Sequence, residues 1–462
     1  MTATRTILDS IIYILTFSLL FLSPLPYGSF EPWARFLLQI QAFLLFILWF
    51  FWSMYSSHNP NLNIKSYLPI LCFVIICLIQ IIPLPEFILG ALSKNGLQIW
   101  GKNQTILASI GFTGESNMFT ISLYPHATWV ETLLLLSYIA FGFVVSRVYT
   151  TESQLRILLI PVFGVSVFEA TYGIYQYLLS SSGGSATGFA SGSFGNHNHF
   201  AGFLEMSIPL VLGYALSLGE WHNGKGGSFF RGLVSSDNFQ RQILILFLLA
   251  MLLLVIFLSG SRMGIFSTLL SLAFFYLAYS SFRKSGSKKA WMILFVLAVA
   301  LIYGLWIGLY PVFERFINVE VDAPIRILVW KDMLGMMMDF PLLGTGFGTF
   351  GYVYPLYKKY MEAPLVYTYA HNDYLQLIIE TGILGFFSVI TALTLFLLSR
   401  VRNLGRFSQK ENHFRFFMSL GALSGIVSLL IHSLADFNLH IPSNALYFAF
   451  LIGFLKAIQT RD

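Results

Sequence analysis

Long runs of apolar residues recur along this chain and alternate with short polar or glycine-rich stretches. A helix needs about 20 mostly apolar residues to cross the hydrocarbon core of a bilayer, and about twelve segments approach that length. We therefore predict an all-α polytopic membrane protein in which residues 1–462 form a single transmembrane domain. The predicted spans are residues 7–23, 33–53, 66–84, 128–148, 156–179, 200–218, 241–259, 263–282, 290–310, 374–398, 415–435 and 442–458.

The composition agrees with a chain that resides in lipid. Hydrophobic residues make up 56% and charged residues 10% of the sequence, whereas a soluble domain carries about 25% charged residues. The formal net charge of +6 comes from basic residues in short connections and not from a basic stripe. We therefore expect the bilayer, and not nucleic acid, as a partner. The two cysteines, Cys72 and Cys77, share one apolar segment and cannot form a zinc site alone.

Lysine and arginine mark one side of the membrane. They concentrate in the connections around residues 147–156, 225–241, 283–289 and 400–415, and cytoplasmic connections are enriched in these residue types. All four connections fall on the same side if both termini are cytoplasmic, which is the orientation that we predict. The connections predicted on the outer side are residues 85–127, 180–199, 260–262, 311–371 and 436–441.

The connection of residues 311–371 is the largest on the predicted outer side. Its sequence APIRILVWKDMLGMMMDFPLLG has apolar residues at helical spacing up to Phe340 and Pro341. This pattern predicts an amphipathic helix on the outer leaflet. The glycine-rich sequence GTGFGTFG follows and predicts a tight loop. No lysine follows these glycines and no strand is expected before them, so a phosphate-binding loop is a weak alternative.

Five polar clusters stand at the predicted outer ends of the spans. They lie in YTYAHNDYLQLIIETGILG (367–385), SGSFGNHNHFAGFLE (191–205), LSGSRMG (258–264), the predicted helix around Arg326, and HSLADFNLHIPSN (432–444). Residues that only anchor helices would be shared between both sides of the membrane, whereas these clusters gather on one side. Arginines and a histidine that face one outer cavity indicate a site for an anionic, membrane-borne substrate.

Each cluster also has a structural explanation. His371 could anchor a helix at the interface, Arg262 could extend to the lipid headgroups, and Arg326 could lie on a solvated helix face. Asp373 with Gln376 three residues later has the form of a capping box, which predicts a helix that begins at Asp373. Asp373 could instead orient the imidazole of His371, and the sequence leaves both roles open.

The stretches FGNHNHFAGFLEM, SGSRMG, PLLGTGFGTF and HNDYLQLIIETGILG, in this order, resemble the O-antigen ligase and polymerase superfamily of bacterial inner membranes. The resemblance covers residues 190–400, and the N-terminal third matches only in its pattern of spans. It implies a multi-span fold with a large periplasmic loop and a site at the periplasmic face. It also implies transfer of a glycan from a polyprenyl-diphosphate carrier to an acceptor sugar, with no metal and no other cofactor.

The resemblance also assigns residues. By position, Arg262 and Arg326 correspond to the essential arginines of the family, and His371 corresponds to its essential histidine. Two guanidinium groups would neutralise charge on the departing diphosphate, and the histidine would take the proton of the acceptor hydroxyl as general base. The predicted substrate-binding residues are Asn196, Asn198, His199, Asn372, Asp373 and Asp436. Whether His197, His199 or His440 takes part in catalysis stays open.

The implied partners are a lipid-linked glycan donor and an acceptor sugar, on the lipid A core or on a second lipid-linked repeat. A chain-length regulator is an open candidate partner. Ligase and polymerase share the residues above, so the sequence does not separate them. A transporter or flippase for lipid-linked glycans is the first alternative, although transporters place polar groups near the midplane. A metal-dependent membrane hydrolase is the second, because His197 and His199, or His432, Asp436 and His440, have spacings that could ligate zinc.

Overall fold

The computed structural model describes residues 2–55, 67–111, 118–181, 188–218, 237–283, 288–307, 319–359, 367–409 and 412–459. In this part of the chain, helices joined by loops make up the architecture, with one short strand pairing. Strand β1 (Leu84–Pro85) is antiparallel to strand β2 (Met118–Phe119). The predicted all-α membrane protein is confirmed, and the small β-ribbon is an addition that the sequence did not predict.

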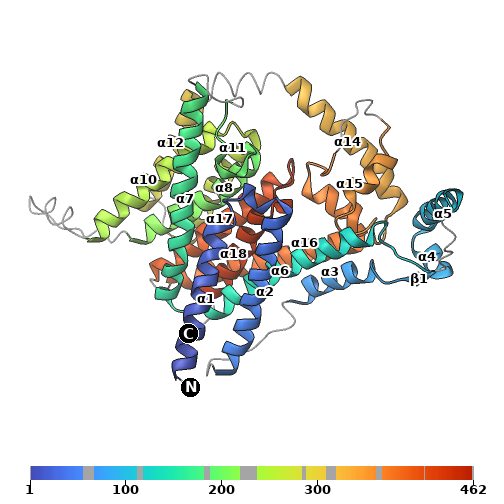
Figure 1. Ribbon diagram of the computed structural model, residues 1–462. Coiled ribbons are helices and arrows are strands. Elements are labelled where there is room, and N and C mark those ends of the chain that lie inside the picture. Colours follow the sequence, from blue (N-terminus) through green and yellow to red (C-terminus); the bar gives the residue numbers. More distant parts are fainter. Residues whose placement is uncertain are drawn as a thin grey trace, which may run out of the picture.

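Every predicted span coincides with a helix. Eight helices within the described residues are long and apolar enough to cross a membrane, and four shorter apolar helices overlap the other four predicted spans. The eight are α2 (Pro32–Tyr55), α6 (Pro125–Val148), α7 (Glu152–Ser181), α8 (His197–Leu218), α10 (Asp237–Leu258), α11 (Arg262–Phe282), α16 (Asp373–Gln409) and α17 (His413–His432). The four are α1 (Thr2–Leu22), α3 (Leu68–Ile79), α12 (Lys288–Ile307) and α18 (Pro442–Ile458). Figure 1 shows the start of α1 and the end of α18 towards the same end of the bundle.

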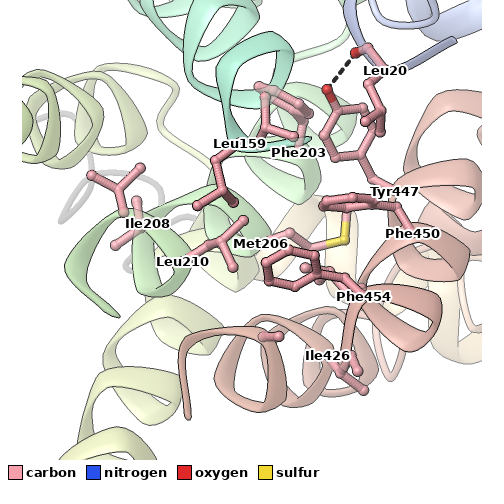
Figure 2. Close-up of a cluster of buried hydrophobic side chains, with 14 of the residues drawn as sticks. Leu20, Leu159, Phe203, Met206, Ile208, Leu210, Ile426, Tyr447, Phe450 and Phe454 are labelled. Atoms are coloured by element: carbon pink, nitrogen blue, oxygen red, sulfur yellow. Dashed lines mark hydrogen bonds between the residues drawn. The ribbon is translucent and has the colours of Figure 1, made fainter. Parts of the chain in front are cut away.

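Helices α8 and α17 form the centre of the bundle. In the most apolar 18-residue segment of each helix, 89% and 83% of the residues are buried. Their backbones approach closely at Gly213, where a Cβ would lie 2.5 Å from the carbonyl oxygen of Phe417. Figure 2 shows the apolar side chains of α7, α8, α17 and α18 that pack around this pair. In the same cluster, the hydroxyl of Tyr447 donates to the carbonyl of Leu20 in α1. This packing fixes the start of α8 and the end of α17, both of which lie in polar clusters.

The long connection before α16 contains the predicted helix. Helix α14 (Val319–Asp339) stops just before Phe340 and Pro341, as the sequence indicates. Its buried side chains, Val329, Met333 and Met336, pack in one cluster with α15 (Phe350–Val353) and the turn η4 (Tyr354–Leu356). One face of α14 therefore contacts protein, and its placement on the outer leaflet stays a prediction. Residues 311–318 and 360–366 of this connection lie outside the described residues.

Other outer connections contain short elements that the apolar pattern did not predict. Helices α4 (Glu86–Leu92) and α5 (Lys94–Ser109) follow strand β1 and precede strand β2 in the sequence. Figure 1 shows them apart from the main bundle. Single 3-10 turns connect several spans, namely η1 (Tyr27–Ser29), η3 (Gly192–Phe194) and η5 (Asn438–His440).

Helix α16 is broken near its start, where Gly382 has φ +64° and ψ −172°. The glycine-rich loop of residues 344–351 lies against this break. Its amides at Gly348 and Phe350 donate to the carboxylate of Glu380 over 2.8 and 3.1 Å. Loop amides that point to one spot can bind a phosphate in this way. Here the carboxyl group of Glu380 takes up these amides, which contradicts the phosphate-binding alternative for this loop.

Replacement of Gly382 by alanine should destabilise the protein. A Cβ at Gly382 would lie 2.2 Å from the carbonyl oxygen of Leu342, and its positive φ disfavours any side chain. Backbone strain of this kind costs about 1–3 kcal/mol, before the clash is counted. Thermal unfolding in detergent should show the loss. Gly101→Ala is the matched control, because a Cβ at Gly101 meets no atom within 4 Å and alanine favours a helix. Equal unfolding temperatures for both variants would contradict the described break.

Candidate functional site

Four of the five polar clusters line one pocket. Its volume is about 100 Å³, and its walls come from the start of α8, the link between α10 and α11, helix α14, and the end of α17 with the residues after it. The lining residues are His197, Asn198, Gly260, Arg262, Met263, Arg326, His432, Ala435 and Asp436. The fifth cluster, around His371, adjoins the pocket through Asp436. The predicted convergence of these distant segments is thus present in the fold.

Arg262 enters the pocket from the first turn of α11. The tight link before it needs a positive φ of +61° at Gly260, whose Cα faces the ring of Phe189. Ser261 then caps α11, because its hydroxyl accepts a hydrogen bond from the amide of Gly264 over 3.2 Å. Arg262 is half-buried and lines the pocket. This position favours the cavity role over extension to lipid headgroups.

Arg326 reaches the same pocket from α14. Its Nη1 donates to the carbonyl oxygen of Ala435 over 2.6 Å, which places the guanidinium beside Asp436. One turn further along α14, the indole of Trp330 donates to the carbonyl of Ala370 over 3.0 Å. These two bonds tie α14 to the segment before α16 and to the connection after α17. Arg326 therefore does not lie on a solvated helix face.

His371 pairs with Asp436. Its Nδ1 lies 3.2 Å from Oδ1 of Asp436, which also accepts from the amide of Phe437 over 2.9 Å. The side chain of His371 is 30% exposed and that of Asp436 only 3%. Burial alone would raise the pKa of Asp436, but the hydrogen bond with His371 and the charge of nearby His432 hold it well below its usual range. An ionised Asp436 can therefore orient the imidazole and stabilise it when protonated.

The backbone at His371 is strained, because its φ is +51°. Residues other than glycine rarely adopt this left-handed conformation, and it costs about 1–3 kcal/mol. The surrounding contacts hold it in place. The side-chain amide of Asn372 donates to the carbonyl of Leu434, and the amide of Asp373 donates to the carbonyl of Ser433. Strain maintained in this way is typical of functional sites.

The helix cap differs from the prediction by one residue. The side chain of Asn372, and not that of Asp373, accepts from the amides of Tyr374 and Leu375 over 3.1 and 3.0 Å. Gln376 does not complete a capping box, since its side-chain oxygen accepts from the amide of Ala370 and its side-chain nitrogen donates to Glu380. The predicted cap at Asp373 is therefore wrong, although α16 does begin there.

Asp373 orients a different histidine. Its Oδ1 lies 2.7 Å from Nδ1 of His440, and its Oδ2 accepts from the amide of Leu439 over 3.1 Å. Burial alone would lower the pKa of His440, but the hydrogen bond and charge of Asp373 raise it above its usual value. The alternative in which Asp373 orients His371 is therefore wrong, because Asp436 occupies that position.

The other predicted binding residues lie at the start of α8. Asn198 lines the pocket, whereas Asn196 accepts from the amide of Asn198 over 2.8 Å and so caps the helix. His199 is buried, with its ring edge-on to Phe437 at 4.8 Å between centroids. Roles for these residues and for Asn372 in substrate binding stay predictions.

The possible zinc set of the sequence does not converge. His432 pairs with Glu205 over 3.0 Å, Asp436 pairs with His371, and His440 pairs with Asp373. Among the described residues, no group of three or more His, Cys, Asp or Glu side chains is placed to hold a metal ion. Glu205 was not among the predicted site residues, although a carboxyl group inside an otherwise apolar span is itself a signal.

Comparison with known families bears on the same segments. Residues 246–390 match the family model described as O-Antigen ligase. The matched segment contains Arg262, Arg326 and His371. No curated protein matches the chain significantly in sequence. The resemblance found from the sequence motifs is confirmed by the family match.

Proposed function

We propose that this chain, whose residues 246–390 match the family model of the O-antigen ligases, is a glycosyltransferase of the bacterial inner membrane. It transfers a glycan from a polyprenyl-diphosphate carrier to an acceptor sugar at the periplasmic face. The acceptor sugar belongs to the lipid A core in a ligase and to a second lipid-linked repeat in a polymerase. The proposed reaction uses no metal and no cofactor.

One observation carries the proposal. Arg262 and Arg326, from separate segments, line one pocket together with Asp436, which pairs with His371. Arginine is well suited to bind the oxygens of a diphosphate, because its planar guanidinium donates two parallel hydrogen bonds. A histidine held by a buried carboxylate is suited to accept a proton. The anion site and the base therefore adjoin each other, as glycan transfer from a lipid diphosphate requires.

The proposed reaction has one displacement step. The acceptor hydroxyl attacks the anomeric carbon of the donor, and its proton passes to Nε2 of His371. The bond from that carbon to the diphosphate oxygen breaks, and its electron pair leaves on the oxygen. Arg262 and Arg326 stabilise this developing charge, and Asp436 stabilises the imidazolium. Polyprenyl diphosphate is released, and attack opposite the leaving group inverts the anomeric centre.

Reconstitution tests the function. The purified protein in lipid nanodiscs, given a polyprenyl-diphosphate glycan and a chelator, should release polyprenyl diphosphate. It should extend either a lipid A core acceptor or a second lipid-linked repeat, and the acceptor used separates ligase from polymerase. Movement of lipid-linked glycan across a liposome membrane without any transfer would replace the proposal with the transporter alternative. Loss of transfer on chelation, with recovery on addition of zinc, would support the hydrolase alternative.

Cysteine labelling should place the site on the periplasmic face. Single cysteines within residues 320–323 should react with an impermeant maleimide in intact cells, because the basic connections predict this side as outer. Cysteines within 285–287 and 403–409 should react only after the inner membrane is opened. Labelling of residue 286 from outside would invert the predicted topology and remove the periplasmic assignment.

A further inference from the structure

A second histidine–carboxylate pair lies beneath the pocket, in the buried centre of the bundle. His432 ends α17 and lines the pocket, and its Nδ1 lies 3.0 Å from Oε2 of Glu205 in α8. Both side chains are fully buried. The hydroxyl of Ser267 in α11 donates to the same oxygen of Glu205. The reaction step derived above uses none of these three residues.

The hydrogen bonds of this pair fit a charged state. Nδ1 of His432 and the hydroxyl of Ser267 meet at one oxygen of Glu205, and an ionised carboxylate can accept from both, since each of its oxygens has two lone pairs. A carboxylate buried in an apolar core requires a compensating cation. The imidazole of His432 is the group in contact with it, so the pair is an imidazolium beside a carboxylate. Nε2 of His432 then carries a proton as well.

Within the part of the chain that the structure describes, that proton has no acceptor. Nε2 of His432 is buried and makes no hydrogen bond to any described group. A buried donor without an acceptor costs about 1–3 kcal/mol, and such a donor at a pocket wall favours an anion as its acceptor. Arg262 and Arg326 line the same pocket, so three cationic groups surround one space.

We propose that His432, held by Glu205 and Ser267, is a third binding residue for the diphosphate of the lipid-linked donor. Its Nε2–H donates to a diphosphate oxygen, alongside the guanidinium groups of Arg262 and Arg326. This inference rests on the proposed function, since it takes the diphosphate as the ligand of the pocket. His432 is a cation and a donor, in contrast to His371, which is a proton acceptor.

Binding of polyprenyl diphosphate, the carrier without its glycan, tests this role in the full-length protein in nanodiscs. His432→Gln should weaken binding by about ten- to a hundredfold, because a hydrogen bond to a charged group is lost. Ser267→Ala should weaken it less, because Glu205 keeps its bond with His432. Ser271→Ala is the matched control one turn along α11, where the hydroxyl only donates to the carbonyl of Thr268. The control should bind with the parental affinity.

Glu205→Gln separates a charged role from a structural one. Without the carboxylate of Glu205, the second proton of His432 is held only at lower pH. The affinity of Glu205→Gln for polyprenyl diphosphate, divided by that of the parental protein, should therefore be low at pH 8 and rise towards one at pH 5.5. His432→Gln should show no such recovery. The other charged and titratable groups around His432 are the same in both proteins, so the ratio isolates the effect of Glu205; they are His197, His199, Arg262, Arg326, Asp373 and Asp436.

The outcomes separate this inference from the function on which it rests. Parental affinity in His432→Gln, with weak binding in Arg262→Ala, would overturn the inference and leave the proposed function intact. An equal loss in Glu205→Gln at both pH values would also overturn it, because the pair would then be structural. Should the parental protein itself fail to bind the probe, the proposed function falls and the inference falls with it.

Discussion

Replacement of His371 by glutamine should lower glycan transfer by about 10²–10⁴-fold, which is the usual contribution of a general base. Glutamine keeps a hydrogen-bonding side chain but cannot take the proton of the acceptor hydroxyl. Binding of the donor should remain at the parental level, because His371 does not line the pocket that holds the arginines. Single-turnover transfer and donor binding, measured on the same preparation, separate the two effects.

His371→Asn controls for folding. Asparagine tolerates the left-handed backbone better than most residues, and the structure requires a φ of +51° at this position. This variant should unfold near the parental temperature and still fail to transfer glycan. Transfer by His371→Gln at close to the parental rate would make His371 an interface anchor. The base would then have to be sought among Asp373, Glu380 and Asp436.

Replacement of Arg262 by alanine should weaken donor binding by about a hundredfold, because a guanidinium makes paired charged hydrogen bonds to phosphate oxygens. Arg262→Lys should recover little of this loss, since an ammonium keeps the charge but not the planar fork. Titration with polyprenyl diphosphate gives the affinities. Arg283→Lys, at the other end of α11, is the matched control. Parental affinity in Arg262→Ala would remove the diphosphate from this pocket.

The membrane-spanning architecture was accessible from the sequence because burial in lipid needs only local information. A run of apolar residues becomes a helix in a bilayer whatever its neighbours are, since every backbone group must be satisfied within the segment. Helices α4 and α5 escaped prediction because they are short and lie outside the apolar runs. The break in α16 was not predicted because a single glycine in an apolar run does not by itself indicate a break. The conformation of Gly382 depends on the segment around Leu342, which packs against it.

The site was predicted in its residue types but not in its pairings. Polar groups at one end of the spans pointed to a shared cavity, and Arg262, Arg326 and Asp436 do line one. The partner of His371 lies 65 positions away, at Asp436, whereas the sequence offered only the nearby Asp373 as a candidate, with a capping role as its alternative. Pairing over such a separation depends on how α16 and α17 pack, which no local pattern records. The same reason hid the contact between Glu205 and His432.

The side chain of Glu380 links the glycine-rich loop to the start of α16, so the two segments can be exchanged with those of another protein only together. The loop amides donate to this carboxylate, and Gln376 contacts both Glu380 and His440. A chimera whose replacement for residues 344–351 adopted a different backbone conformation would leave the buried carboxyl group of Glu380 without these amide donors. Exchange of this loop with that of a related protein should therefore succeed only when the crossover points lie outside residues 341–382.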